Sequence, residues 1–265
     1  MSPSDLDTSP LDTARRLAES GDLGAAAAIL AELAADPDAP DRAQAAVGLA
    51  VVLEESGDVD GARAAARTAL ATGHPEFAAQ AACHLAQGFE REDKDEQARG
   101  AWQAVIGLGT DAYQPLAHLA LARLALRVDE LEEAAQELRA VIDTGDPALA
   151  PEAAQQLAEL LLELGHPGEA ADALVVALEV AEGVSAARLR VQLGIAHLEL
   201  ACAEFAGAVE EGQDAETVAL AIELLARTLP LRGRPEDAEH VWAYGLDHAD
   251  ETLAAHVRNR YARET

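Results

Sequence analysis

The sequence predicts an all-α fold, an α-solenoid of about seven antiparallel helix pairs followed by a C-terminal capping helix. Three patterns recur together, each with a step of 36 residues. The first is a leucine followed by alanine, the second is a lone alanine, and the third is a turn five residues before that alanine. They occur at Leu49, Leu85, Leu121 and Leu157, at Ala26, Ala62, Ala98, Ala134 and Ala170, and at Gly21, Gly57, Asp93, Asp129 and Gly165. Self-similarity of this length is typical of stacked repeat proteins.

Apolar residues three and four apart, such as Ala46, Leu49 and Leu53, mark one face of a helix. Prolines such as Pro75 and Pro147 separate the pairs, because proline is disfavoured inside a helix and favoured in its first turn. The first helices are expected near 10–19, 42–55, 77–91, 114–127, 151–164, 186–201 and 216–229. Their partners are expected near 23–35, 59–71, 95–106, 131–143, 168–181, 204–211 and 235–247, with a last helix near 250–262.

The regular step fails after the fifth pair. The next alanine marker after Ala170 is Ala208, 38 residues on, and Ala238 follows only 30 residues later. We therefore expect a short second helix in the sixth pair and a bend or loose joint near 202–216. Drift in a degenerate repeat and a functional hinge both explain such a break.

These patterns divide the chain into three segments: a disordered N-terminal tail at 1–9, a repeat domain at 10–249, and a capping helix with its tail at 250–265. The last helix places Leu253, Val257 and Tyr261 on one stripe. Stacked repeats need a terminal cap for solubility, so this stripe predicts a capping helix. A dimerisation helix is the alternative, which leaves monomer and dimer both open.

The net charge of −29 opposes binding to nucleic acid and to anionic lipid. Cys83 and Cys202 lie in different repeats, which argues against a disulfide framework and favours the cytoplasm. The first ten residues lack the basic and apolar regions of a signal peptide. No apolar run reaches the length of a membrane span.

In these repeat residues the chain resembles the tetratricopeptide repeat family over about residues 10–247. Three repeats match the family pattern. The first matches at Leu49, Ala50, Leu53, Gly57, Ala62 and Pro75, and the second at Leu85, Ala86, Phe89, Ala98 and Trp102. The third matches at Leu157, Ala158, Leu161, Gly165, Ala170 and Leu174. The chain departs from the family in its period, which is 36 rather than 34 residues. The family's tryptophan is replaced by Ala46, Ala82, His118 and Ala154. The resemblance implies a right-handed superhelix whose first helices line a concave groove for a partner.

One stripe of each first helix then faces this groove. The predicted binding residues are Gln80, Gln87, Leu116, Leu119, Arg123, Gln155, Glu159, Arg190, Leu193, His197 and Arg227. Arginine suits carboxylates and leucine offers apolar anchoring area, so the expected partner is a peptide or helix with apolar anchors and acidic groups. The alternative is that these arginines pair with acids on neighbouring helices, for example Arg123 with Glu159.

Residues for several kinds of chemistry are missing from the sequence. The single lysine, Lys94, lies between two aspartates, so a nucleotide-binding P-loop is absent, and the family's lysine and asparagine carboxylate clamp cannot form. The histidines form no metal-binding motif, and Cys83 is expected to be a structural thiol. We expect no cofactor and no metal.

The sequence therefore favours a non-catalytic, cytoplasmic scaffold or adaptor that binds a protein. A ligand-sensing or regulatory helical domain, with a small molecule near Arg123, Arg190 and His197, is the alternative. A helical toroid enzyme is the third class.

Overall fold

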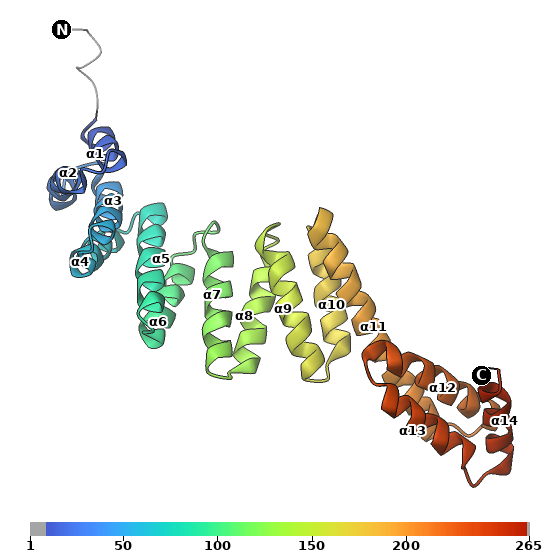
Figure 1. Ribbon diagram of the computed structural model, residues 1–265. Helices are drawn as coiled ribbons and strands as arrows, with labels where there is room; N and C mark the ends of the chain where they lie inside the picture. Colours follow the sequence, from blue (N-terminus) through green and yellow to red (C-terminus); the bar gives the residue numbers. More distant parts are fainter. Residues whose placement is uncertain (1–8, 264–265) are drawn as a thin grey trace. The chain divides into compact units, whose positions relative to one another are not determined.

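The computed structural model describes residues 9–263, and within that range the chain forms helices joined by short turns, with no strand (Figure 1). The predicted all-α helical repeat is confirmed. The chain divides into two compact units after Thr144. The N-terminal unit contains α1 (Pro10–Glu19), α2 (Leu23–Ala35), α3 (Arg42–Glu55), α4 (Val59–Ala71), α5 (Pro75–Arg91), α6 (Asp95–Gly107), α7 (Gln114–Arg127) and α8 (Leu131–Asp143).

The C-terminal unit contains α9 (Leu149–Glu163), α10 (Pro167–Leu178), α11 (Gly183–Glu211), α12 (Ala215–Thr228), the short 3-10 helix η1 (Leu229–Arg232), α13 (Pro235–Leu246) and α14 (Glu251–Tyr261). The tail predicted at 1–9 lies outside the described residues except for Ser9. The Ser9 hydroxyl accepts a hydrogen bond from the Asp12 N–H at 3.1 Å and so caps α1.

The turn inside each of the first five pairs has a residue with positive φ, and these residues are 36 positions apart. Three are glycines, at Gly21, Gly57 and Gly165, whereas Asp93 and Asp129 adopt φ values of 53° and 62°. This left-handed conformation is open to glycine and strained for residues with a Cβ atom. The same left-handed backbone conformation therefore recurs in these turns with the period of 36 residues seen in the sequence.

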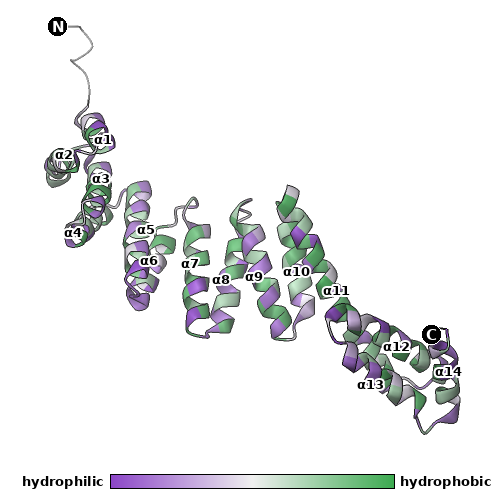
Figure 2. Ribbon diagram, in the orientation of Figure 1, coloured by the Kyte–Doolittle hydropathy of each residue, from purple (hydrophilic) through white to green (hydrophobic). Residues whose placement is uncertain are grey.

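Alanine-rich helix faces close on one another within each pair. In the third pair, Ala82 and Ala86 of α5 are buried in one cluster with Ala98 and Trp102 of α6. Figure 2 shows hydrophobic and hydrophilic residues interleaved along every helix, as expected when one stripe is buried and another meets water. Small side chains at the seam let the paired helix backbones approach closely.

The sixth pair differs from the prediction. The expected helices at 186–201 and 204–211 are one continuous helix, α11, so the predicted turn between them is wrong. Ala201 stands at the position of the positive-φ turn residue, and no proline, asparagine or aspartate occurs between Gly194 and Glu211 to end the helix. The irregular segment predicted near 202–216 is reduced to the connection 212–214.

The second half of α11 packs with α12, α13 and α14. Cys202 of α11 shares a buried cluster with Ile222 of α12 and Trp242 of α13. Leu253 and Val257 of α14 are buried in the same cluster, and Tyr261 meets the Trp242 ring edge to face at 5.1 Å. The apolar stripe of the last helix thus packs against the other helices of the C-terminal unit.

Across residues 9–263, none of the helices combines the length and apolar character that crossing a membrane requires.

The strained turns give a direct test of the repeat. Replacing Asp93 or Asp129 by glycine relieves the positive φ, and we expect each change to raise the free energy of unfolding by about 0.5–1 kcal/mol. Chemical denaturation measures the change. Asp93→Asn is the control because it removes the same charge and keeps the Cβ atom. Lower stability of Asp93→Gly than of the parent chain would contradict this account of the turns.

Candidate functional site

The first helices of the N-terminal unit line a hollow of about 280 Å³ together with one residue of α2. We call it the N-terminal hollow. It is lined by Leu11, Ala14, Arg15, Ala18, Leu30, Gln44, Val47, Gly48, Val51, Val52, Phe77 and Gln80. Gln80, one of the predicted binding residues, lies here. Val51 is 39% exposed, so an aliphatic surface is available to a ligand.

The middle of the predicted stripe is less accessible than the sequence suggested. Leu119 is only 8% exposed, and Cys83, one repeat earlier, is 6% exposed. Leu116 is partly buried against the core cluster that contains Cys83 and Trp102. Gln87 is exposed. Leu119 therefore offers almost no area as an apolar anchor, which corrects its predicted role.

Arg123 is engaged within the N-terminal unit. Its guanidinium donates to the Glu90 carboxylate at 2.6 Å, and the same carboxylate accepts from the Trp102 indole N–H at 2.6 Å. Arg127 lies 4.0 Å from Glu90 and 3.0 Å from Asp95. The predicted alternative, an arginine paired with an acid on a neighbouring helix, holds for Arg123, although Glu90 is the acid it contacts. Glu159 accepts a hydrogen bond from Gln192 at 3.1 Å.

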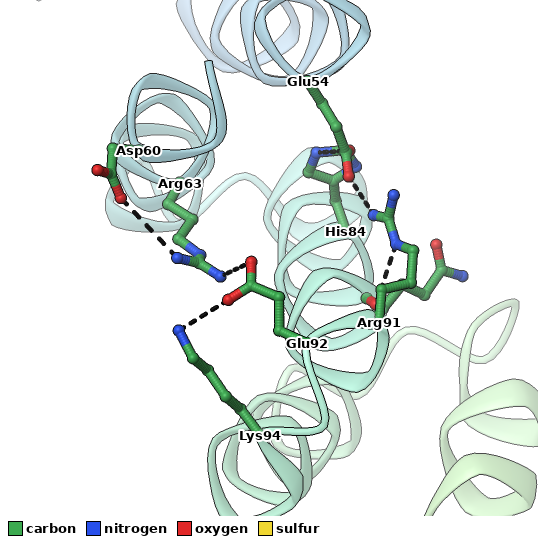
Figure 3. A network of polar contacts seen from close by, with 8 residues as sticks. Glu54, Asp60, Arg63, His84, Arg91, Glu92 and Lys94 are labelled. Atoms are coloured by element: carbon green, nitrogen blue, oxygen red, sulfur yellow. Dashed lines mark hydrogen bonds and ion pairs between the residues drawn. The ribbon is translucent and has the colours of Figure 1, made fainter. Parts of the chain in front are cut away.

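The same arrangement occurs one repeat earlier, as Figure 3 shows. The Glu54 carboxylate of α3 meets the His84 Nε2 atom of α5 at 2.7 Å and also pairs with Arg91. Glu54 and Glu90 are 36 residues apart, and so are Arg91 and Arg127. An acid at the end of one first helix thus pairs with a base on the next first helix, which ties successive pairs together.

A second ion-pair group joins α4 to the turn that follows α5. Arg63 pairs with Glu92, and Lys94 contacts Glu92 at 2.7 Å (Figure 3). The Arg63 guanidinium also lies 5.0 Å from the centre of the Phe89 ring. The Arg63 hydrogen bond, followed by that of Lys94, lowers the pKa of Glu92 to about 2. Arg63 and Lys94 are therefore both paired with an acid of the same unit.

Arg227 of the C-terminal unit also belongs to an internal network. It contacts the Glu223 carboxylate at 2.9 Å, and Arg260 of α14 contacts the other oxygen at 2.7 Å. Glu223 is buried, so these arginines compensate a charge removed from water. Arg227 thus helps hold α12 and α14, a role that the sequence did not suggest.

A second hollow, the C-terminal hollow, opens between α9 and α11. It is lined by Gln155, Val184, Ala187, Arg188, Val191 and Gln192. Val184 and Val191 are 69% and 65% exposed. Of the predicted binding residues, only Gln155 lies here. Arg190, Leu193 and His197, which were expected beside it, do not line this hollow.

The reason is a shift of two residues in the predicted stripe. Adding the period of 36 to Glu152 and Gln155 gives Arg188 and Val191, and these are the residues that face the C-terminal hollow. By the same step, Arg190, Leu193 and His197 are the repeat equivalents of Ala154, Leu157 and Leu161. Those three residues belong to the core of α9. The repeat period itself was the signal that locates Arg188 and Val191.

The two cysteine thiols of the chain are buried. Burial raises the pKa of the Cys83 thiol to about 11, and burial also raises the pKa of Cys202. Both cysteines are free. No group of three or more histidine, cysteine, aspartate or glutamate side chains gathers as a metal site in the described part of the chain.

Residues 68–189 match the family model described as a tetratricopeptide repeat-like domain. This part of the chain is therefore similar to the tetratricopeptide repeat family. The matched segment runs from α4 to the start of α11 and includes the turns at Asp93, Asp129 and Gly165. No curated protein sequence matches the chain.

Among solved structures, the chain is similar to a tetratricopeptide repeat protein from Parabacteroides merdae, at 15% identity over 95% of this chain and 97% of that one, with a TM-score of 0.48. It is also similar to the C-terminal part of a TPR repeat-containing protein from Cytophaga hutchinsonii, at 16% identity over 96% and 94%, with a TM-score of 0.46. A thermophilic TPR protein from Thermus thermophilus is 24% identical over 71% of this chain and 97% of that one, with a TM-score of 0.35.

The tetratricopeptide repeat-like fold generally mediates protein–protein interaction, and proteins of this family are generally non-catalytic scaffolds.

The buried network around Glu223 gives a prediction for α14. Replacing Arg260 by methionine leaves Glu223 with one arginine fewer, and we expect the free energy of unfolding to fall by about 1–3 kcal/mol. Arg258→Met is the matched control, because its 2.7 Å pair with Glu251 is exposed, and we expect a change within about 0.5 kcal/mol. Denaturant unfolding followed by circular dichroism compares the two. Equal effects would show that the Glu223 network does not stabilise the C-terminal unit.

Proposed function

We propose that this chain is a non-catalytic scaffold that holds segments of a partner protein against the first-helix side of its repeats. The main support is the C-terminal hollow, where two exposed valines lie beside an arginine without an internal partner. Neither Arg188 nor Arg190 has a carboxylate partner among residues 9–263. An arginine without an acidic partner beside apolar area suits an acidic ligand with apolar anchors.

The N-terminal hollow supports the same proposal with different chemistry. Its lining is mainly aliphatic and also includes the amide side chains of Gln44 and Gln80. Amides can donate to and accept from the backbone of an extended peptide. The two hollows together favour a partner that presents apolar anchors, with acidic groups preferred beside Arg188.

The remaining predicted residues divide by their contacts. Gln80 and Gln155 stay binding candidates because they line the hollows, and Gln87 stays one because it is exposed. Arg123 and Arg227 are held by Glu90 and Glu223, so a partner would have to compete with those pairs. Two free, buried thiols fit a reducing compartment, and we propose a cytoplasmic location.

A photo-crosslinking experiment tests the proposal at residue level. A photo-reactive phenylalanine replaces Val191 in the C-terminal hollow, Val51 in the N-terminal hollow, or Val175 on α10, and each chain is irradiated in the cells that produce it. Val175 is the matched control because it is 49% exposed and lines neither hollow. We expect one protein partner to be captured at Val191 or Val51 and not at Val175.

A second variant tests whether capture at Val191 depends on the charge of Arg188. Arg188→Glu should reduce capture at Val191 by about tenfold or more, since it places like charge against an acidic ligand. Capture of the same proteins at all three positions would contradict the proposal. Binding of a small molecule alone, seen by native mass spectrometry, would favour the ligand-sensing alternative.

A further inference from the structure

The first half of α11 is a first helix whose partner helix is missing. Leu193 and Gly194 continue the series of a leucine followed by a small residue at 49, 85, 121 and 157, at the same step of 36 residues. In the earlier pairs a second helix follows, whereas α11 runs straight on from beside α10 into the group formed by α12, α13 and α14 (Figure 1). The sixth repeat therefore has only one of its two helices.

The face of α11 that would meet the missing helix is uncovered. We call Arg190, Leu193, Gly194 and His197 the open face. Gly194 is exposed, whereas its equivalents Ala50, Ala86, Ala122 and Ala158 are at most 1% exposed. Arg190 and His197 are exposed and Leu193 is partly buried. These four positions are the seam of a helix pair everywhere else in the repeat.

One complete pair shows which chemistry suits this face. His118 of α7 occupies the position equivalent to Arg190, and its Nδ1 atom lies 2.6 Å from the Glu137 carboxylate of α8. A polar residue at this position is thus met by a glutamate of the second helix. Arg190 has no such carboxylate among the described residues. A helix docked here with a glutamate at the place of Glu137 would supply it.

The space for such a helix is present. A Cβ atom added at Gly194 meets nothing within 4 Å. Glycine at a helix seam lets a second backbone approach closely, as the equivalent alanines do inside the complete pairs. Gly194 lowers the helix propensity of α11, so it is an unfavourable choice unless close approach is used.

We propose that the open face of α11 binds one helix of a partner protein, an amphipathic helix with small aliphatic residues for Leu193 and Gly194 and a carboxylate for Arg190. The bound helix completes the sixth pair. This site is separate from the C-terminal hollow, which lies on a different side of α11 and is lined by Arg188 and Val191. The inference does not depend on the scaffold function proposed above.

The chain supplies its own probe for the test. A fluorescein-labelled peptide with the sequence of α8, residues 131–143, carries Glu137 and the apolar face that meets α7. An isolated helix of this length is marginal in water, so a staple joins the exposed positions of Glu132 and Gln136. Fluorescence anisotropy measures its binding to the whole chain at physiological salt, where screening reduces the repulsion between two acidic molecules.

We expect saturable binding that Gly194→Phe weakens by at least tenfold, because the new ring fills the space of the docked helix. Gly207→Phe is the matched control, on the same helix and also without neighbours within 4 Å of an added Cβ, and it should bind as the parent chain does. Arg190→Glu should weaken binding of the parent peptide and strengthen binding of a peptide with Glu137→Arg. Circular dichroism checks that each variant keeps its helicity.

Two results would overturn the proposal. One is absence of binding, or binding that Gly194→Phe and Gly207→Phe affect equally. The other is a chain that is a dimer in sedimentation and becomes monomeric with Gly194→Phe, which would assign the open face to a second copy of this chain.

Discussion

Burial of a leucine and its small neighbour against a paired helix is the interaction on which this structure depends. Leu157 and Ala158 of α9 are fully buried, and Leu121 and Ala122 of α7 are nearly so. Small residues at this seam set the close approach of the two helices, and large aliphatic residues supply the apolar area. Ion pairs such as Arg91 with Glu54 and Arg127 with Asp95 then link one pair to the next. Their partial exposure means that they contribute less than the seam does.

In the sixth repeat this seam is incomplete, and the consequences are confined to α11. Without a turn residue at Ala201, the helix continues, and its second half packs against α12 and α13 through Cys202. The first half keeps the repeat residues Leu193 and Gly194, whose usual partner is missing. The exposure of Arg190, Gly194 and His197 thus follows from one local difference, the missing turn. Arg190 on this face has no carboxylate partner among the described residues, whereas Arg123 and Arg227 contact Glu90 and Glu223.

The sequence was sufficient for the parts of the fold that repeat. The step of 36 residues placed ten helices of the first five pairs, because glycine, aspartate and proline mark every turn. It did not reveal that α11 is continuous, since an alanine-rich stretch is equally compatible with one helix or two. Gln80 and Gln155 line the two hollows, and their role in binding stays a prediction. Arg190, Leu193 and His197 lie outside the C-terminal hollow, because the predicted stripe was shifted by two residues from the period. The internal pair of Arg123 with Glu90 depends on a contact between residues distant in sequence, which the repeat pattern does not reveal.

Amide hydrogen exchange across residues 198–206 tests the central claim, that the sixth repeat is one helix without a partner. A continuous α11 predicts protection through Leu200, Cys202 and Glu204, because each amide is bonded within the helix. The turn at Gly165–Pro167 provides the internal reference for an open connection. Exchange at Cys202 as fast as in that turn would show that the helix breaks there and that the sixth repeat contains two helices.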